Sequence, residues 1–301
     1  GTSFDSAEGS VGIDITVGGI DVGAQVYSGK TYDSYGKTQL DFIFSDSRVS
    51  SSIIRVKGDV NVGGGLDIYS SSVLRIAADK MAVDGVVNMD LNGGSYSNIL
   101  FQKAVVFEIG GLNATSERND FTICNTGGFS SGIVFKNAAG TDFMFIGNIC
   151  DDGNSLQYHH DGVVNIAMDG AGTQRIFQSM FSTASESQYS ARQRGTVSAK
   201  SGRLFMDNSR IAADYRLAAL SLEGGRFGAG HYDSSQAGTA YFKSANFQSG
   251  GLAYENFANH NAVETQASDK IIITETFSKA AGSGKISVDF SDKDGNALNL
   301  S

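Results

Sequence analysis

The densest group of side chains able to do chemistry lies in residues 151–161. It contains two histidines, three carboxylates and one phenol: Asp151, Asp152, Tyr158, His159, His160 and Asp161. A β-helical enzyme that cleaves glycans would line a groove with such carboxylates and a histidine or lysine base. Adjacent histidines on a strand point to opposite faces, so His159 and His160 would not share one metal ion. We predict a binding site here without a metal, and a solvent-facing turn is the alternative.

Three shorter motifs match known sites only in part. Residues 24–31 end in Gly-Lys-Thr like a phosphate-binding loop, but no glycine stands among the four preceding residues and no helix pattern follows. Gly128–Gly132 matches the nucleophile elbow around Ser130, but residues 133–136 read as a strand where the elbow needs a helix. Asp292–Asn296 fits a hairpin turn better than a calcium loop. We therefore expect no catalytic residue and no cofactor.

The composition excludes several classes of protein. The chain has 301 residues, 41% of them hydrophobic and 18% charged, with a net charge of −9 and no proline. Average usage would give about 15 prolines, and their absence indicates a backbone whose N–H groups are needed for pairing. No basic cluster favours nucleic acid, and no apolar run is long enough to span a membrane. No signal-peptide pattern opens the sequence, so we expect any export signal to have been removed or to lie outside it.

Short segments of alternating apolar and polar residues recur along the whole chain. A period of two indicates strands with one buried face, and turn residues separate them. The best helix candidate is Ser185–Arg194. The predicted strands are Val11–Val17, Leu40–Phe44, Ile54–Val56, Val60–Val62, Val87–Leu91, Val105–Ile109, Val164–Met168, Leu220–Leu222, Ile271–Ile273, Ile286–Phe290 and Leu298–Leu300. The chain is predicted to be all-β.

An irregular repeat of about 26 residues favours a parallel β-helix over a sandwich or barrel. Val83–Asn88 recurs loosely as His160–Asn165, 77 residues later, close to three such units. Cys124 and Cys150 stand one unit apart. Stacked coils are spaced by about 4.8 Å, so the two cysteines would be neighbours, either bridged or as free buried thiols.

The C-terminal third resembles the end of a bacterial autotransporter passenger domain. The residues that carry the resemblance are Ala267–Thr274, the small-residue spacer Ala280–Gly284, Lys285–Phe290 and the turn Asp292–Asn296. A weaker similarity to autotransporter-associated strand repeats runs from Ile109–Leu112 to Phe129–Ile133. The membrane barrel that follows the passenger in this family is missing from the sequence.

This resemblance implies an exported, single-stranded, right-handed parallel β-helix with a C-terminal hairpin-like cap. We expect one domain over residues 1–301, in which residues 265–301 cap the stack or start its folding. The expected function is a non-catalytic adhesin or binding scaffold at the bacterial cell surface, with a glycan or a surface protein as partner and a barrel outside this sequence. A polysaccharide-degrading enzyme and a surface-layer or matrix protein are the alternatives.

Overall fold

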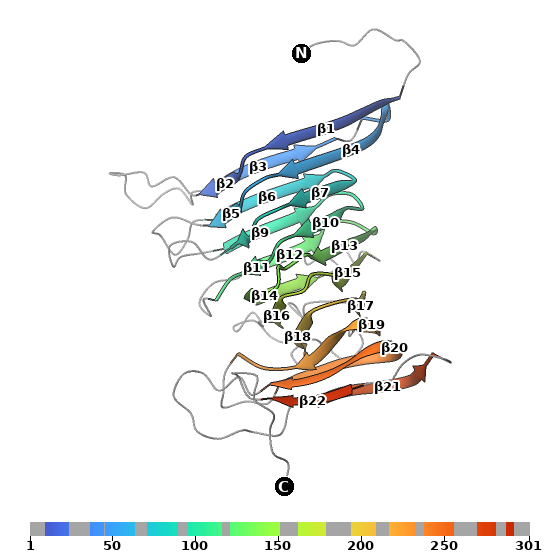
Figure 1. The fold of residues 1–301 in the computed structure, drawn as a ribbon. Helices are drawn as coiled ribbons and strands as arrows, with labels where there is room; N and C mark the ends of the chain where they lie inside the picture. Colours follow the sequence, from blue (N-terminus) through green and yellow to red (C-terminus); the bar gives the residue numbers. More distant parts are fainter. Residues whose placement is uncertain are drawn as a thin grey trace, which may run out of the picture.

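The computed structural model describes residues 10–23, 37–44, 46–63, 71–89, 96–115, 121–150, 162–178, 194–208, 217–232, 238–255, 270–280 and 287–291. Every strand pair in these residues is parallel, and the strands stack into an elongated β-solenoid (Figure 1). No helix occurs in the described ranges. The predicted all-β parallel solenoid is therefore confirmed.

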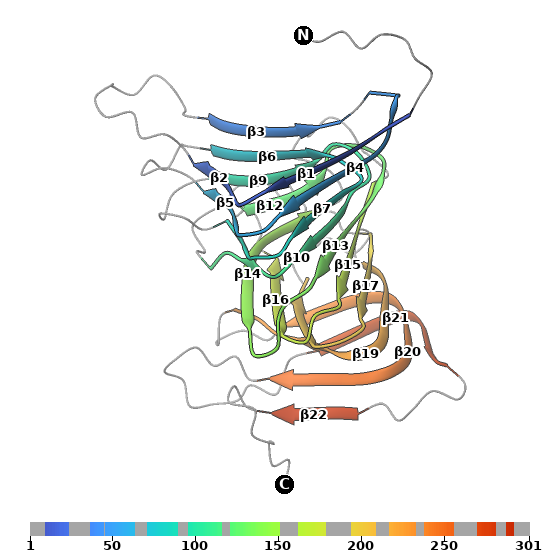
Figure 2. The ribbon, with the colours of Figure 1, turned by 45° about the horizontal axis from the view of Figure 1, so that its top comes forward.

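Three ladders of stacked strands form the sides of the solenoid. Ladder A runs through every coil and contains β1 (Val11–Val17), β4 (Val49–Val56), β7 (Lys80–Val83), β10 (Val106–Ile109), β13 (Ser130–Phe135), β15 (Val163–Met168), β17 (Thr196–Ala199) and parts of β19 (Leu217–Ala229), β20 (Thr239–Glu255) and β21 (Lys270–Lys279). Ladder C contains β3 (Lys37–Ile43), β6 (Ser71–Ala77), β9 (Tyr96–Phe101), β12 (Phe121–Asn125) and the end of β14 (Asp142–Cys150). Figure 2 shows β3, β6 and β9 stacked beside the strands of ladder A.

Ladder B consists of two parts. The upper part contains β2 (Ile20–Gly23), β5 (Val60–Gly63), β8 (Val87–Asn88) and β11 (Leu112–Asn113). The lower part contains the start of β14, then β16 (Thr173–Gln178), β18 (Arg203–Asp207), the ends of β19 and β20, and β22 (Ser287–Ser291). A single bridge between Ala114 and Phe145 joins the two parts. The ladder is thus interrupted between β11 and β14.

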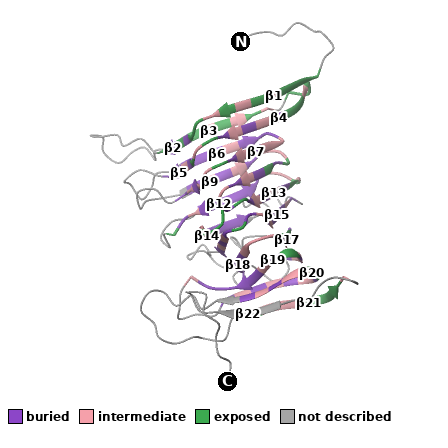
Figure 3. Cartoon of the chain, in the orientation of Figure 1, coloured by how far each residue is buried: buried purple, intermediate pink, exposed green. Residues whose placement is uncertain are grey.

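The core is a row of apolar side chains that continues from coil to coil. In ladder A, Ile54, Met81, Phe107, Ile133 and Ile166 occupy equivalent positions and are at most 1% exposed. The residues between them face outward, so the alternation seen in the sequence reports one inner and one outer face. Figure 3 shows the buried residues along the middle of the stack and the exposed ones at β1 and in β21.

The predicted repeat of about 26 residues holds in the coils from β4 to β13, and one predicted match between coils is wrong. Polar contacts between neighbouring coils join residues 27, 26 and 25 apart in the coils from β4 to β13, and 31 to 35 apart in several later ones. Val87, however, lies in ladder B, whereas Val164 lies in ladder A opposite Ser131. The match between Val83–Asn88 and His160–Asn165 is therefore coincidental, because the same local pattern fits more than one side of a coil.

Cys124 and Cys150 are in register on β12 and β14, as predicted from their spacing. Cys124 is a free thiol and fully buried. Three further predicted features lie outside the described residues: the helix candidate up to residue 193, the hairpin turn Asp292–Asn296 and the strand Leu298–Leu300. β22, which corresponds to the first strand of that predicted hairpin, pairs in parallel with β20.

Candidate binding surfaces

The six residues predicted as a binding site lie outside the described part of the chain. They are Asp151, Asp152, Tyr158, His159, His160 and Asp161. Residues 24–31 and 292–296, which match a phosphate loop and a calcium loop in part, lie outside it as well. The predicted site therefore stays a prediction.

Ser130 does not sit in a nucleophile elbow. It begins strand β13, which runs to Phe135, where the elbow would require a helix. Its hydroxyl accepts a hydrogen bond from the side-chain amide of Asn165, at 3.1 Å. The predicted strand after Ser130 is confirmed, and the residue belongs to a polar outer face.

A row of side-chain amides runs along the outer face of the upper part of ladder B. The Nδ2 atom of Asn61 donates to Oδ1 of Asp21 at 2.6 Å, and Asn88 donates to Asn61 at 3.0 Å. Asn113 donates to Asn88 at 3.5 Å. We call Asp21, Asn61, Asn88 and Asn113 the amide row. Each of these side-chain hydrogen bonds joins two neighbouring coils, so the row links four coils. The remaining polar groups of the row are open to solvent.

A glycine stands at the corner of the coil before each member of the amide row, and we call this position the glycine corner. Each member follows a glycine by three residues, as Asn88 follows Gly85 and Asn113 follows Gly110. A Cβ atom at Gly110 would lie 2.6 Å from the carbonyl oxygen of Gly85, far inside van der Waals contact. The corner therefore admits only glycine there. The predictions from the sequence did not include the amide row, although this Gly-x-apolar-Asn pattern signals it at intervals of 27 and 25 residues.

The outer face of ladder A changes character along the stack. Near the N-terminal end it carries ion pairs, Arg55 with Asp14 at 3.2 Å and Lys80 with Glu108 at 2.7 Å. From β13 to β21 the outward positions in the middle of the paired segments carry no charge. They are Ser130, Gly132, Val134, Val163, Asn165, Ala167, Thr196, Ser198, Ala219, Ser221, Ser244, Asn246, Thr276 and Ser278. We call these residues the uncharged band.

Charged residues border the uncharged band, and the carboxylate of Glu223 accepts a hydrogen bond from the hydroxyl of Ser221 at 3.3 Å. Lys136 follows the last residue of β13 and forms an ion pair with Asp169, which follows β15. Glu223, Lys243 and Glu275 lie where the pairing of β19, β20 and β21 shifts register. The band is therefore a neutral surface between charged edges.

Side-chain hydrogen bonds order parts of the uncharged band. The hydroxyl of Thr196 donates to Oδ1 of Asn165 at 2.9 Å, and the amide of Asn165 reaches Ser130. The hydroxyl of Ser278 donates to Oδ1 of Asn246 at 3.3 Å. Small side chains on stacked strands make this face flat, and its hydroxyl and amide groups can donate and accept hydrogen bonds.

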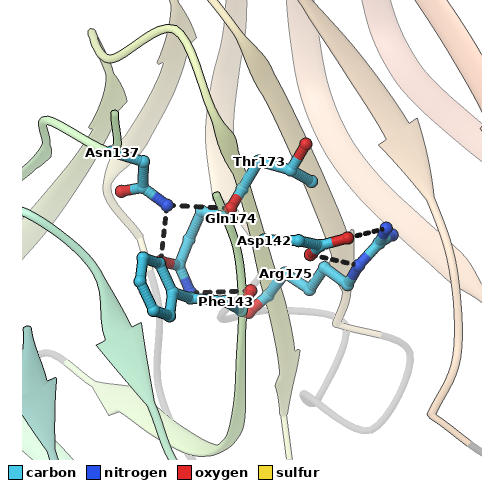
Figure 4. A network of polar contacts seen from close by, with 6 residues as sticks. All are labelled: Asn137, Asp142, Phe143, Thr173, Gln174 and Arg175. Carbon is cyan, nitrogen blue, oxygen red and sulfur yellow. Dashed lines mark hydrogen bonds and ion pairs between the residues drawn. The ribbon is translucent and has the colours of Figure 1, made fainter. Parts of the chain in front are cut away.

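A buried polar network occupies the interruption of ladder B. Figure 4 shows Gln174 between Asn137 and Phe143, with the Asp142–Arg175 ion pair beside it. Gln174 is fully buried and accepts a hydrogen bond from the backbone N–H of Leu112 at 3.0 Å. Its amide donates to the carbonyl of Leu112 at 2.9 Å. The network satisfies backbone groups that the interrupted ladder leaves open, so its role is structural.

One buried acid and one buried histidine meet after β18 and β19. Nε2 of His231 lies 3.5 Å from Oδ2 of Asp207, and both side chains are 3% exposed. The ring of Tyr232 stacks on that of His231 at 4.6 Å. The side-chain amide of Asn208, next to this pair, donates a hydrogen bond to the carbonyl of Tyr241 and accepts one from its N–H. The pair is closed to solvent, so it can fix this corner but offers no open face to a substrate.

Neither the family models, the curated proteins nor the solved structures contain a match to this chain. Within the described residues no helix is long and apolar enough to cross a membrane. The same residues hold no group of three or more histidine, cysteine or acidic side chains that could bind a metal ion.

Proposed function

We propose that this chain is a non-catalytic binding scaffold of a bacterial cell-surface adhesin of the autotransporter-passenger type. The supporting observation is the uncharged band, on which hydroxyl and amide side chains stand among apolar ones along a parallel stack. The C-terminal sequence resemblance supports the extracellular setting. A membrane barrel outside this sequence would anchor the protein.

A neutral glycan is the partner that suits the uncharged band. Hydroxyl and amide side chains match the donors and acceptors of sugar hydroxyls. The band carries no charge that a neutral ligand would leave unpaired or that would attract an ionic competitor. Stacked coils repeat the same groups at about 4.8 Å, so an extended chain could contact several coils at once.

A glycan array with the purified chain tests the proposal. The informative variant is Ser198→Arg, which places a long charged side chain in the middle of the band. The matched control is Ala82→Arg, because Ala82 occupies the same outward row in the charged half of ladder A. We expect binding of neutral glycans that Ser198→Arg weakens about tenfold or more and Ala82→Arg leaves unchanged.

Absence of glycan binding, or an equal loss of glycan binding in both variants, would contradict the proposal that the uncharged band binds glycans. The polysaccharide-degrading alternative is tested on the same samples by measuring new reducing ends and unsaturated sugars. Cleavage products that accumulate with time to many per protein chain would show that the chain is an enzyme and would contradict the non-catalytic proposal.

A further inference from the structure

We propose that the outer face of ladder C binds an acidic glycan, with a sugar carboxylate on Arg75 and neutral sugar groups along Asn98, Thr122 and Asn148. We call these four residues the ladder C row. The row is separate from the uncharged band, which lies on ladder A and holds no charged side chain.

The ladder C row crosses four consecutive coils. Thr122 on β12 is in register with Asn98 on β9 and with Asn148 on β14. Arg75 on β6 lies one coil before Asn98 and two residues further along its strand, since its own partner is Leu100. Coils are spaced by about 4.8 Å, so the row is about 14 Å long. Figure 2 shows β6, β9 and β12 stacked side by side.

All four side chains of the row point away from the core. Their neighbours in the strands are fully buried in the apolar core: Leu74, Ile99, Ile123 and Ile149. Successive side chains of a strand point to opposite faces, so the row lies on the outer one. Arg75 and Asn98 are half-buried, whereas Thr122 is 5% and Asn148 2% exposed. The row is therefore most open at Arg75, where a ligand would enter.

Asn148 is the residue that points to a ligand. Its Nδ2 and Oδ1 atoms are both buried, and neither has a hydrogen-bond partner in the described chain. A buried amide without partners destabilises a fold, because it has lost its contacts with water and gained none in return. A bound group that supplies the missing hydrogen bonds explains such an amide. A sugar hydroxyl both donates and accepts, as the amide does, so the two are complementary.

Arg75 makes the row selective for an anion. Its Nε atom is buried and lacks a hydrogen-bond partner among the described residues. Asp41 is in register with Arg75 on β3, but its two carboxylate oxygens lie 2.9 and 2.8 Å from Nε2 of Gln39. The guanidinium is a planar fork of donors that matches a carboxylate in two hydrogen bonds. A carboxylate on the ligand therefore suits this end of the row.

A glycan fits the ladder C row better than a polyanion or a peptide. One cation followed by three neutral side chains matches an acidic sugar joined to neutral ones, whereas a polyanion would leave charges unpaired beside the amides. A peptide that adds to a sheet needs the open backbone of an edge strand. The backbones of β9 and β12 are instead paired with neighbouring coils on both sides.

Isothermal titration calorimetry of the 301-residue chain tests this site. The probe is a tetrasaccharide of alternating glucuronic acid and N-acetylglucosamine. We expect binding that Arg75→Gln weakens about tenfold or more, because a charge-assisted pair is lost. Arg55→Gln is the matched control and should leave the affinity unchanged, since Arg55 is an outward arginine that already pairs with Asp14 at 3.2 Å. The same tetrasaccharide with its carboxyls reduced to alcohols should bind the unmodified chain and Arg75→Gln equally.

Asn148→Leu separates a role in binding from a role in stability. Leucine has a similar size but no polar atoms, so it removes two buried atoms that lack partners. We expect the affinity for the acidic tetrasaccharide to fall about tenfold, while the melting temperature of the ligand-free chain rises. An asparagine that only supports the fold would lower the melting temperature when replaced.

The proposal is overturned when the acidic tetrasaccharide does not bind, or when Arg75→Gln binds it as tightly as the unmodified chain. Tighter binding of a tetraglutamate peptide, or a lower melting temperature of Asn148→Leu, would overturn it as well. Circular dichroism reports the folding of each variant. Arg75→Lys keeps the charge without the fork and should bind with intermediate affinity, which keeps the test decisive should Arg75→Gln fold poorly. Neutral glycans should bind the uncharged band of Arg75→Gln unchanged, so the two proposals succeed or fail separately.

Discussion

The side chain of Gln174 hydrogen-bonds both backbone groups of Leu112, a residue 62 positions earlier in the chain. The contact skips one coil, because Phe143 lies between the two in the stack. It occurs where ladder B is interrupted, and it replaces two ladder hydrogen bonds by side-chain ones. A fully buried glutamine thus joins the two parts of this ladder, beside the backbone bridge between Ala114 and Phe145.

Gln174→Leu should destabilise the middle of the solenoid. The substitution keeps the size of the side chain but leaves the buried N–H and C=O of Leu112 without partners, at about 1–3 kcal/mol each. We expect a loss of about 2–5 kcal/mol and faster hydrogen exchange at Leu112, measured by urea unfolding and exchange mass spectrometry. Gln39→Leu, at an exposed position of β3, is the control and should change little. Equal effects of the two substitutions would contradict the role of Gln174.

Gly110→Ala should be far more damaging than Gly18→Ala. The new Cβ at Gly110 would approach the carbonyl oxygens of Gly85 and Asp84 at 2.6 and 2.7 Å, whereas the space at Gly18 is open within 4 Å. Both glycines stand three residues before a member of the amide row. We expect Gly110→Ala to cost about 2 kcal/mol or more and Gly18→Ala less than about 1 kcal/mol, compared by thermal unfolding. Similar melting temperatures would show that the corner can widen.

Asp79 should make stability depend on acid pH. The ammonium of Lys103 at 2.5 Å, aided by hydrogen bonds from the N–H and hydroxyl of Ser52, lowers the pKa of Asp79 below its ordinary 3.8, and partial burial opposes this. A lowered pKa in the folded state adds stability above about pH 4, and this stability is lost as the pH falls through the folded-state pKa.

Asp79→Asn should therefore destabilise the chain at neutral pH, by about 1 kcal/mol or less because the carboxylate is 44% exposed. The difference from the unmodified chain should shrink as the pH falls below about 4 in urea melts recorded across the acid range. Asp46→Asn is the control. The pKa of Asp46 is lowered by Arg48, but both side chains are exposed and the pair lies within one turn, so stability should hardly change. If the difference in unfolding free energy between Asp79→Asn and the unmodified chain were the same at every pH, the proposed link between the pKa of Asp79 and stability would be wrong.

Cys124 should be protected from thiol reagents in the folded chain. Its side chain is fully buried, and reagents reach it only when the coil opens. In a Cys150→Ser background Cys124 is the one remaining cysteine, because the sequence has two. We expect no titration of this variant by Ellman's reagent under native conditions and one thiol per chain in denaturant. Rapid native labelling would place Cys124 at an accessible surface.

The solenoid and several of its strands are predictable from the sequence because both depend on local spacing. Alternation in Ile54–Val56 or Val164–Met168 marks which side chains are buried, whatever the strand pairs with. A 26-residue interval between Cys124 and Cys150 corresponds to one coil, so their register followed from the same reasoning. The six polar residues from Asp151 to Asp161 lie outside the described chain and remain a prediction.

An all-β solenoid and its approximate coil length thus follow from the order of the residues alone. Only the stacked coils settle which side of a coil each strand occupies, and therefore which polar residues meet. Val83–Asn88 and His160–Asn165 look alike as sequences, but Val87 and Val164 lie on different ladders. Gln174 meets Leu112 only after the coils have stacked. The physical reason is that a period of two fixes an inner and an outer face locally, whereas hydrogen bonds between coils depend on the length of every turn that separates them.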